Sequence, residues 1–139
     1  HGLPPGCLEV EVTESLFGQA VALRSMLEEL RALGVRIALD DFGTGYSSLG
    51  QLRSLPLDRL KIDRSFVADL EGGGGGQAIA QTIVTLAQSL GLAVTAEGVE
   101  NEAQRRILLD LGARDAQGWL FHAALSATAL EGLLPDGRH

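Results

Sequence analysis

Short strand-like runs and amphipathic helical stretches alternate along the whole chain. Alternating polar and apolar residues over 8–12 predict a strand, and a stripe of leucines predicts a helix over 16–33 that stops at Gly34. The apolar run over 35–39 predicts a buried strand. The remaining expected elements are a short helix over 46–55 ended by Pro56, a strand over 59–62, a helix over 77–90, a strand over 92–96, a helix to 111 capped by Asn101 with help from Gln104, a strand around 116–120 and a helix over 126–134.

This order of elements indicates an α/β protein. Strands that alternate with helices imply a parallel sheet with the helices packed on it. A doubly wound sheet and part of a barrel both fit the pattern, and periodicity alone does not choose between them. The glycine run over 72–76 reads as a flexible linker or surface loop.

Composition limits the classes of protein that fit. At 139 residues and 45% hydrophobic content, one domain with a packed core is expected. The net charge of −7 excludes nonspecific binding to DNA, although metal cations would still let an acidic protein bind a phosphate ligand. Cys7 is the only cysteine, so no intrachain disulfide forms. With no signal peptide, and polar residues within the longest apolar segment (78–96), a cytoplasmic location without a membrane segment is expected.

Polar residues gather where the predicted strands end. In parallel α/β folds, the chemistry collects at the carboxyl ends of the strands. In chain order, these ends carry Glu11 with Glu14, then Asp40 with Asp41, Lys61 with Asp63, Glu97 with Glu100, and Gln117.

Strand parity places several of these residues on one face. If the valines, leucines and isoleucines face the helices, Glu11, Asp40, Lys61 and Glu97 share the opposite, inward face. Carboxylates that converge there repel one another unless cations neutralise them, and Mg²⁺ or Mn²⁺ suits ligands that are all oxygen. Glu9 fits this scheme poorly, because parity places it one layer below Glu11. Either it is paired there or the strand register is irregular.

The adjacent aspartates favour a site with two metal ions, and plainer interpretations remain open. Asp40 is suited to bridge two ions while Asp41 binds one of them. Alternatively, the pair is an acidic N-cap of the helix that follows. Lys61 would, in the plainer interpretation, pair with Asp63 or Asp58 at the surface.

Five segments together closely resemble the EAL family of cyclic di-GMP phosphodiesterases. They are LEVEVTES (8–15), LDDFGTGYSSL (39–49), LKIDRSFV (60–67), LGLAVTAEGVE (90–100) and QGWLF (117–121). The resemblance implies a TIM-like (β/α) barrel, of which residues 1–139 supply roughly the last five βα units of one EAL domain. The Glu-Ala-Leu motif and an asparagine ligand of the family lie upstream of these segments and are expected outside this chain.

The resemblance also implies a reaction and a set of site residues. The family hydrolyses one phosphodiester bond of cyclic di-GMP to give linear pGpG in a metal-dependent reaction. Carried over, the metal ligands are Glu11, Asp40 as the bridging residue, Asp41 and Glu97. Asp40, Glu97 and Lys61 carry the catalysis, with Lys61 positioning the attacking water or helping to deprotonate it.

Further residues have supporting roles by the same resemblance. Glu14 anchors the loop after Asp41, Thr44 belongs to that loop, Glu100 supports the site and Gln117 lies beside the substrate. The 42–49 region matches the loop that couples metal binding to homodimer contacts in the family.

Two hypotheses of different classes follow. In the first, the chain is part of an active phosphodiesterase, weak or inactive without the missing N-terminal part of the barrel. In the second, it is a degenerate, non-catalytic EAL remnant that binds a nucleotide or a protein partner as a regulatory module. Sensor domains are expected upstream in either case.

Overall fold

The computed structural model describes residues 2–43, 49–73 and 75–133. The elements in chain order are the 3₁₀ helix η1 (Pro5–Cys7), β1 (Glu9–Thr13), the 3₁₀ helix η2 (Glu14–Gln19), α1 (Ala20–Ala32), β2 (Arg36–Phe42), α2 (Leu49–Ser54), β3 (Arg59–Ile62), α3 (Arg64–Ala68), α4 (Gly76–Leu90), β4 (Ala93–Ala96), α5 (Glu102–Leu111), β5 (Asp115–Ala116) and α6 (Ala127–Glu131).

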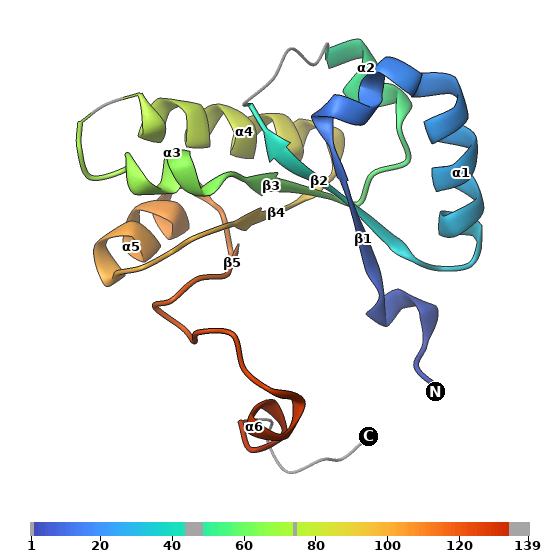
Figure 1. Ribbon diagram of the computed structural model, residues 1–139. Coiled ribbons are helices and arrows are strands. Elements are labelled where there is room, and N and C mark those ends of the chain that lie inside the picture. Colours follow the sequence, from blue (N-terminus) through green and yellow to red (C-terminus); the bar gives the residue numbers. More distant parts are fainter. Residues whose placement is uncertain (1, 44–48, 74, 134–139) are drawn as a thin grey trace.

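The five strands form one parallel sheet, as the alternation of elements predicts (Figure 1). Their order is β1-β2-β3-β4-β5, so neighbours in the sequence are neighbours in the sheet. A doubly wound sheet would instead reverse its order at a switch point. The order is that of a barrel segment, and it resolves the choice that periodicity left open.

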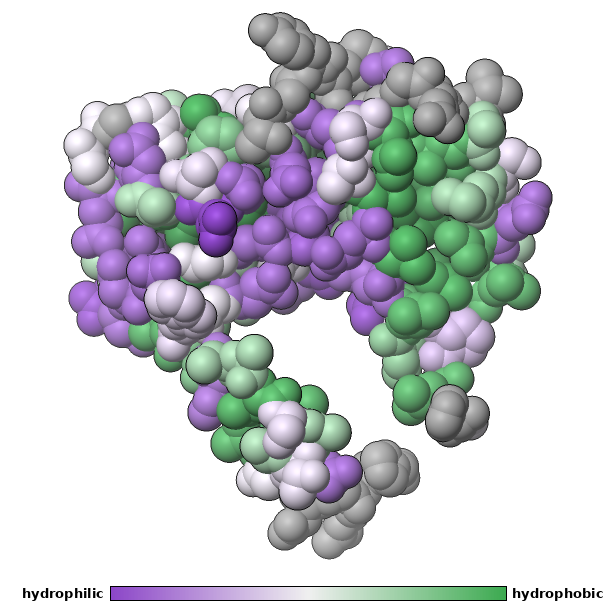
Figure 2. Space-filling model, viewed as in Figure 1, coloured by the Kyte–Doolittle hydropathy of each residue, from purple (hydrophilic) through white to green (hydrophobic). Residues whose placement is uncertain are grey.

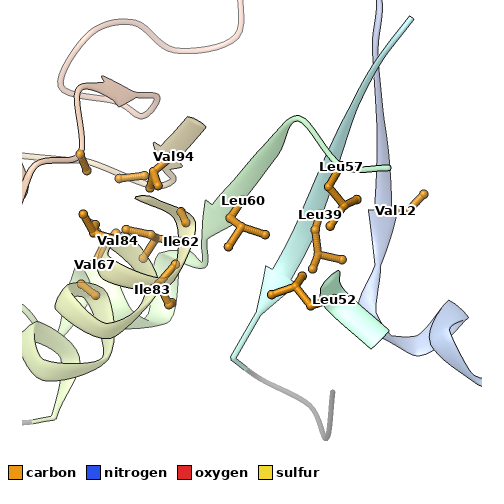
Figure 3. Close-up of a cluster of buried hydrophobic side chains, with 14 of the residues drawn as sticks. Val12, Leu39, Leu52, Leu57, Leu60, Ile62, Val67, Ile83, Val84 and Val94 are labelled. Atoms are coloured by element: carbon orange, nitrogen blue, oxygen red, sulfur yellow. The ribbon is translucent and has the colours of Figure 1, made fainter. Parts of the chain in front are cut away.

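The hydrophobic core lies between the sheet and the helices, on the outer face of the sheet (Figure 3). Leu39, Leu60 and Ile62 from the strands are fully buried, and Ile83 and Val84 of α4 pack with them. Burying one such side chain contributes about 1.5–3 kcal/mol. The expected parity is confirmed, because the valine, leucine and isoleucine residues of the strands point to this core and the other face carries polar side chains together with the small Ala38.

Two helical stretches differ from the sequence prediction. The helix expected from residue 16 begins as the 3₁₀ helix η2 and becomes α-helical only at Ala20. Gly18 lies in this segment and is a poor helix former. A side-chain bond between the hydroxyls of Thr13 and Ser15, at 2.8 Å, also ties its start to β1.

The short helix α3 was not expected. Asp63 caps it, with Oδ1 accepting a hydrogen bond from the backbone N–H of Ser65 at 2.9 Å. The glycine run that follows is not simply a flexible linker, because Gly76 is buried and begins α4. A Cβ atom on Gly76 would lie 2.7 Å from the carbonyl oxygen of Phe66, so only glycine permits this close approach of α3 and α4.

The last strand is shorter than predicted. β5 ends at Ala116, because the chain turns at Gly118, which packs tightly against the backbone of Val99. Residues 121–133 are all exposed, and α6 lies apart from the sheet (Figure 1). Within the residues that the structure covers, no helix has the length and apolar character needed to cross a bilayer.

Asn101 caps α5 as predicted, with Oδ1 accepting a hydrogen bond from the N–H of Gln104 at 2.9 Å. We expect Asn101→Ala to lower the free energy of unfolding by about 1 kcal/mol, because an N–H in the first turn loses its partner. Ser126→Ala is the matched control, since Ser126 caps the exposed α6. Urea unfolding of both variants checks this, and an equal loss of stability in the two would contradict it.

Candidate active site

Carboxylates from separate strands meet Lys61, the only lysine of the chain, on the inner face of the sheet. Its Nζ atom lies 2.6 Å from Glu11 Oε1 and 2.6 Å from Glu97 Oε1. Asp40 Oδ1 lies 3.4 Å from the same atom. The Lys61 side chain is only 4% exposed, so these contacts form in a largely desolvated setting. The four residues that parity placed on one face are therefore brought together, and we call them the Lys61 cluster.

The surface pairings considered for Lys61 do not occur. Asp63 serves as the cap of α3 through Ser65. Asp58 lies at the other end of β3, where Oδ2 accepts a hydrogen bond from the N–H of Ile37 at 2.9 Å. Lys61 is instead the internal counter-ion of the carboxylates.

The charges of the cluster are unbalanced. Burial by itself lowers the pKa of Lys61, but hydrogen bonds to Glu11 and Glu97 and the nearby charge of Asp40 outweigh it and hold the pKa well above its usual value. Lys61 therefore keeps its proton at neutral pH. Three carboxylates around one ammonium leave two negative charges without a counter-charge inside the cluster.

The excess of negative charge also affects the pKa of Glu97, which is raised. Burial raises its pKa, and the charges of Asp40 and Glu11 add to that effect. The hydrogen bond and charge of Lys61 lower the pKa but do not compensate fully. The pKa values of Lys61 and Glu97 are both raised, and the two shifts are consistent. Several carboxylates stabilise the charged form of Lys61, whereas Glu97 shares the single cation with Glu11 and Asp40.

Asp41 lies in an irregularity that the sequence prediction missed. β2 was expected to end at Leu39, but it continues to Phe42, and between these residues it holds one residue more than β3 opposite. Such a bulge bends the strand and redirects side chains. Asp41 has a φ of 56°, which is unusual for a residue other than glycine, and its N–H donates to Asp40 Oδ1 at 3.0 Å. Strained backbone of this kind clusters at functional sites.

Asp41 also has a raised pKa. Burial is the first cause, and the charge of Asp40 is the second. A cation placed near both aspartates would relieve this repulsion. The alternative in which the two aspartates cap the next helix depends on residues 44–48, which lie outside the described part of the chain.

Glu14 reaches the start of the loop that follows β2. Its Oε1 atom accepts a hydrogen bond from the N–H of Gly43 at 3.3 Å. Its Oε2 atom is buried and has no hydrogen-bond partner among residues 2–43, 49–73 and 75–133. Gly43 has a φ of 95°, and a Cβ there would lie 3.2 Å from the ring of Phe66. Of the 42–49 region expected to form dimer contacts, residues 44–48, which include Thr44, lie outside the described residues.

Gln117 and Glu100 lie on the Glu97 side of the cluster. The side-chain amide of Gln117 donates to Glu97 Oε1 at 2.6 Å. Glu100 is exposed, and its backbone N–H donates to the side-chain oxygen of Gln104 at 2.8 Å. With Trp119, Glu100 and Gln104 line a hollow of about 380 Å³. Gln104 is itself buried, and its role in holding Glu100 was missed because its signal in the sequence is that of an ordinary capping residue.

Glu9, which fitted the parity scheme poorly, forms an ion pair on the inner face of the sheet. Its Oε2 atom lies 3.1 Å from Nε of Arg59, which the sequence prediction did not single out. Arg59 stands two residues before Lys61, so strand parity was the signal that could have found it.

The cluster has the chemistry of a metal site, although it is not arranged as one. Carboxylate oxygens held around a cation are the donors that Mg²⁺ and Mn²⁺ prefer. In the described residues, however, no group of three or more acids, histidines or cysteines stands in an arrangement that could hold a metal ion. The carboxylates are directed at Lys61 instead. The oxygen donors are therefore of the type that binds a divalent cation, and in this structure the ammonium group of Lys61 is the cation that the carboxylates surround.

The chain belongs to the EAL domain family, whose model matches residues 1–124. This finding agrees with the five-stranded parallel sheet and with the residues that gather on its inner face. It confirms the resemblance read from the sequence.

Individual relatives are similar over nearly the whole chain. Cyclic di-GMP phosphodiesterase NbdA of Pseudomonas aeruginosa is 48% identical over 134 residues, which cover 96% of this chain and 17% of NbdA. The PaMucR phosphodiesterase, solved as a c-di-GMP complex, superposes with a TM-score of 0.89 at 46% identity over 94% of this chain and 53% of that one. BlrP1 of Klebsiella pneumoniae, solved with manganese and c-di-GMP, has a TM-score of 0.78 at 38% identity over 86% of this chain and 30% of that one.

The match is to part of each relative. The chain spans 15–22% of the length of the curated relatives that it matches.

Proposed function

We propose that this chain forms the later part of an EAL-domain phosphodiesterase that hydrolyses one phosphodiester bond of cyclic di-GMP and releases linear pGpG. The observation that carries the proposal is the convergence of Glu11, Asp40 and Glu97 on the buried Lys61. Catalytic groups of barrel enzymes collect at this end of the strands. The similarity to NbdA and to the c-di-GMP complex of PaMucR supports the choice of substrate.

Glu11, Asp40, Asp41 and Glu97 would hold the two Mg²⁺ or Mn²⁺ ions, and Asp40 would serve as a ligand to both. The unbalanced negative charge of the cluster favours a divalent cation. When bound, such ions supply a polarised phosphoryl oxygen and a water of lowered pKa. The manganese complex of BlrP1 supports this assignment.

Lys61 is proposed to position the attacking water or to help deprotonate it. Before metal binds, its carboxylate neighbours raise its pKa, so it holds its proton and donates hydrogen bonds to Glu11 and Glu97. In this arrangement it suits the positioning of a water oxygen. Removal of a proton by Lys61 would first require loss of its contacts with Glu11 and Glu97.

Four further residues are proposed to support the site. Gln117, which donates to Glu97, would contact the substrate beside the cluster. Glu14 would hold the loop after β2 through Gly43, and Thr44 would act within that loop. Glu100 would support the site from the adjacent hollow.

The arrangement of the whole protein is part of the proposal. Residues 1–139 would complete one EAL domain together with the barrel strands that carry the Glu-Ala-Leu motif. Contacts through the 42–49 region would form a homodimer, and sensor domains would regulate the activity. We place the protein in the cytoplasm, where cyclic di-GMP would be its substrate.

Incubation of the full-length protein with cyclic di-GMP and Mn²⁺ tests the proposed function, with products separated by chromatography. Linear pGpG is expected to accumulate, and a chelator is expected to stop its formation. Cyclic di-AMP serves as the control, because it has the same cyclic phosphodiester backbone with different bases. A folded protein that binds Mn²⁺ and yields no pGpG would refute the enzyme.

A regulatory module that binds the nucleotide without cleaving it is the second candidate. It is favoured by one observation, the absence of a metal-holding group within the described residues, where Lys61 satisfies the carboxylates. Calorimetry separates the two candidates. Saturable binding of cyclic di-GMP in the absence of any product would support the module.

A further inference from the structure

A second polar layer lies on the inner face of the sheet, next to the Lys61 cluster. The guanidinium group of Arg59 contacts side chains from three other strands, namely Glu9 Oε2 at 3.1 Å, Asp115 Oδ2 at 2.5 Å and the hydroxyl of Thr95. Only 15% of the Arg59 side chain is exposed, whereas its partner Asp115 is 56% exposed, so the guanidinium group is largely buried and the bond to Asp115 lies at the surface. We call these four residues the Arg59 layer. Figure 2 shows the hydrophilic surface of this face, across the middle of the molecule.

Each member of the Arg59 layer stands two residues before a residue of the candidate site. The pairs are Glu9 and Glu11, Arg59 and Lys61, Thr95 and Glu97, and Asp115 and Gln117. Side chains two residues apart along a strand point to the same face. The two layers are therefore stacked, and the same four segments of chain carry both.

β2 contributes a small residue to the lower layer. Ala38, two residues before Asp40, is paired with Arg59 across β2 and β3 and is fully buried. Glu9 lies on β1, so the guanidinium group must cross β2 to reach it. A methyl side chain at position 38 leaves that path open, whereas a longer one would obstruct it.

The contacts of Arg59 join the outermost strands to the centre of the sheet. Glu9 is on β1 and Asp115 is on β5, the two ends of the strand order. A planar guanidinium group donates in fixed directions to several acceptors at once, which a lysine ammonium does less well. Arg59 therefore ties side chains of β1 and β5 to β3 on the inner face, in addition to the backbone ladders between neighbouring strands.

We propose that Arg59 is a positioning residue for the Lys61 cluster. The backbone ladders set the spacing of the strands, and the bonds of Arg59 hold the side chains and ends of β1, β4 and β5 in the arrangement in which Glu11 and Glu97 reach Lys61 and Gln117 reaches Glu97. Arg59 acts through these strands and touches no reacting group. The kinetic part of this inference rests on the proposed function, whereas its structural part does not.

The test compares two variants of the full-length protein, Arg59→Lys and the control Arg24→Met. Arg24 is a surface arginine of α1, paired with Glu28 and 55% exposed. In Arg59→Lys, kcat is expected to fall about tenfold or more while KM changes less than about threefold, because a small displacement of reacting groups slows chemistry steeply. A metal-free crystal structure of Arg59→Lys is expected to show Lys61 beyond hydrogen-bond distance of Glu11 or Glu97, which it contacts in the unsubstituted protein. Arg24→Met is expected to change neither readout.

A charge-neutral triple variant separates positioning from simple stability. Arg59→Met alone leaves Glu9 and Asp115 without their cation and is expected to unfold more easily. Combining it with Glu9→Gln and Asp115→Asn removes the unpaired charges. The triple variant is expected to regain thermal stability without regaining kcat, whereas a purely stabilising role for Arg59 would restore both.

The outcomes decide the inference in each case. Unchanged kcat in Arg59→Lys together with intact Lys61 contacts would overturn it and leave the proposed function standing. If the unsubstituted protein does not hydrolyse cyclic di-GMP, the proposed function fails. The positioning role of Arg59 is then tested only by the distances from Lys61 Nζ to Glu11 and Glu97 in the crystal structure of Arg59→Lys. Distances equal to those of the unsubstituted protein would then overturn the positioning role.

Discussion

Replacing Asp40 by asparagine is expected to lower kcat/KM for cyclic di-GMP by about a thousandfold. The substitution keeps the shape of the side chain and removes its charge. Metal-assisted stabilisation of the transition state contributes several kcal/mol, and each 1.4 kcal/mol corresponds to about a factor of ten in rate. Because Asp40 is proposed to bind both ions, loss of its charge is expected to lower kcat/KM by about three powers of ten.

The same substitution is expected to leave stability unchanged or to raise it. The amide oxygen of the new side chain can still accept the hydrogen bond from the N–H of Asp41, so the bulge of β2 is kept. Burial is the main cause of the raised pKa values of Asp41 and Glu97, and the charge of Asp40, which adds to it, is removed at the same time. Steady-state kinetics and urea unfolding give the two readouts, with Asp110→Asn on the exposed side of α5 as the control. Loss of activity that merely follows loss of folded protein would contradict the assignment.

Lys61→Met is expected to lower the free energy of unfolding of the metal-free protein by about 3 kcal/mol at pH 7. Removing one partner of a buried ion pair leaves the others uncompensated, which typically costs about 3–5 kcal/mol. The lower end applies because the Glu11 side chain is 49% exposed. Lys61→Arg is the control, since it retains the charge and should lose much less. Equal losses in the two variants would show that the charge of Lys61 is not what stabilises the cluster.

The loss in Lys61→Met is expected to shrink as the pH falls from 7 towards 5. The pKa of Glu97 is already raised in the folded state, and removing the lysine charge raises it further. An acid whose folded pKa lies above its unfolded value costs stability as the pH rises through the folded pKa. Unfolding measured across this range checks the sign. A loss that grows on acidification would be contrary to it.

The regular parts of the fold follow from local patterns in the sequence. β3 has the predicted bounds of Arg59–Ile62, and α5 lies between the predicted Asn101 cap and Gly112. Alternation, caps and left-handed glycines act within a few residues, so a sequence contains them completely. Parity also brought the Lys61 cluster onto one face, because every second residue of a strand shares a side.

The misses in the strands come from interactions between distant segments, whereas the missed helix α3 has a local cap, Asp63. The bulge at Asp41 depends on the register between β2 and β3, and no pattern within β2 encodes it. β5 is short because Gly118 packs on Val99, which lies before α5 in the chain. Arg59 went unnoticed because its partners are contributed by three other strands. The poor fit of Glu9 to the parity scheme was the one local sign that such a layer exists.

Anomalous diffraction from crystals of the full-length protein soaked with Mn²⁺ gives the sharpest test of the carboxylate site. Manganese is expected to bind between Asp40 and Glu97, with the ammonium group of Lys61 displaced from Glu97 Oε1. Manganese found only at other acids, with Lys61 still bonded to Glu97 in the presence of the metal, would contradict the two-metal phosphodiesterase.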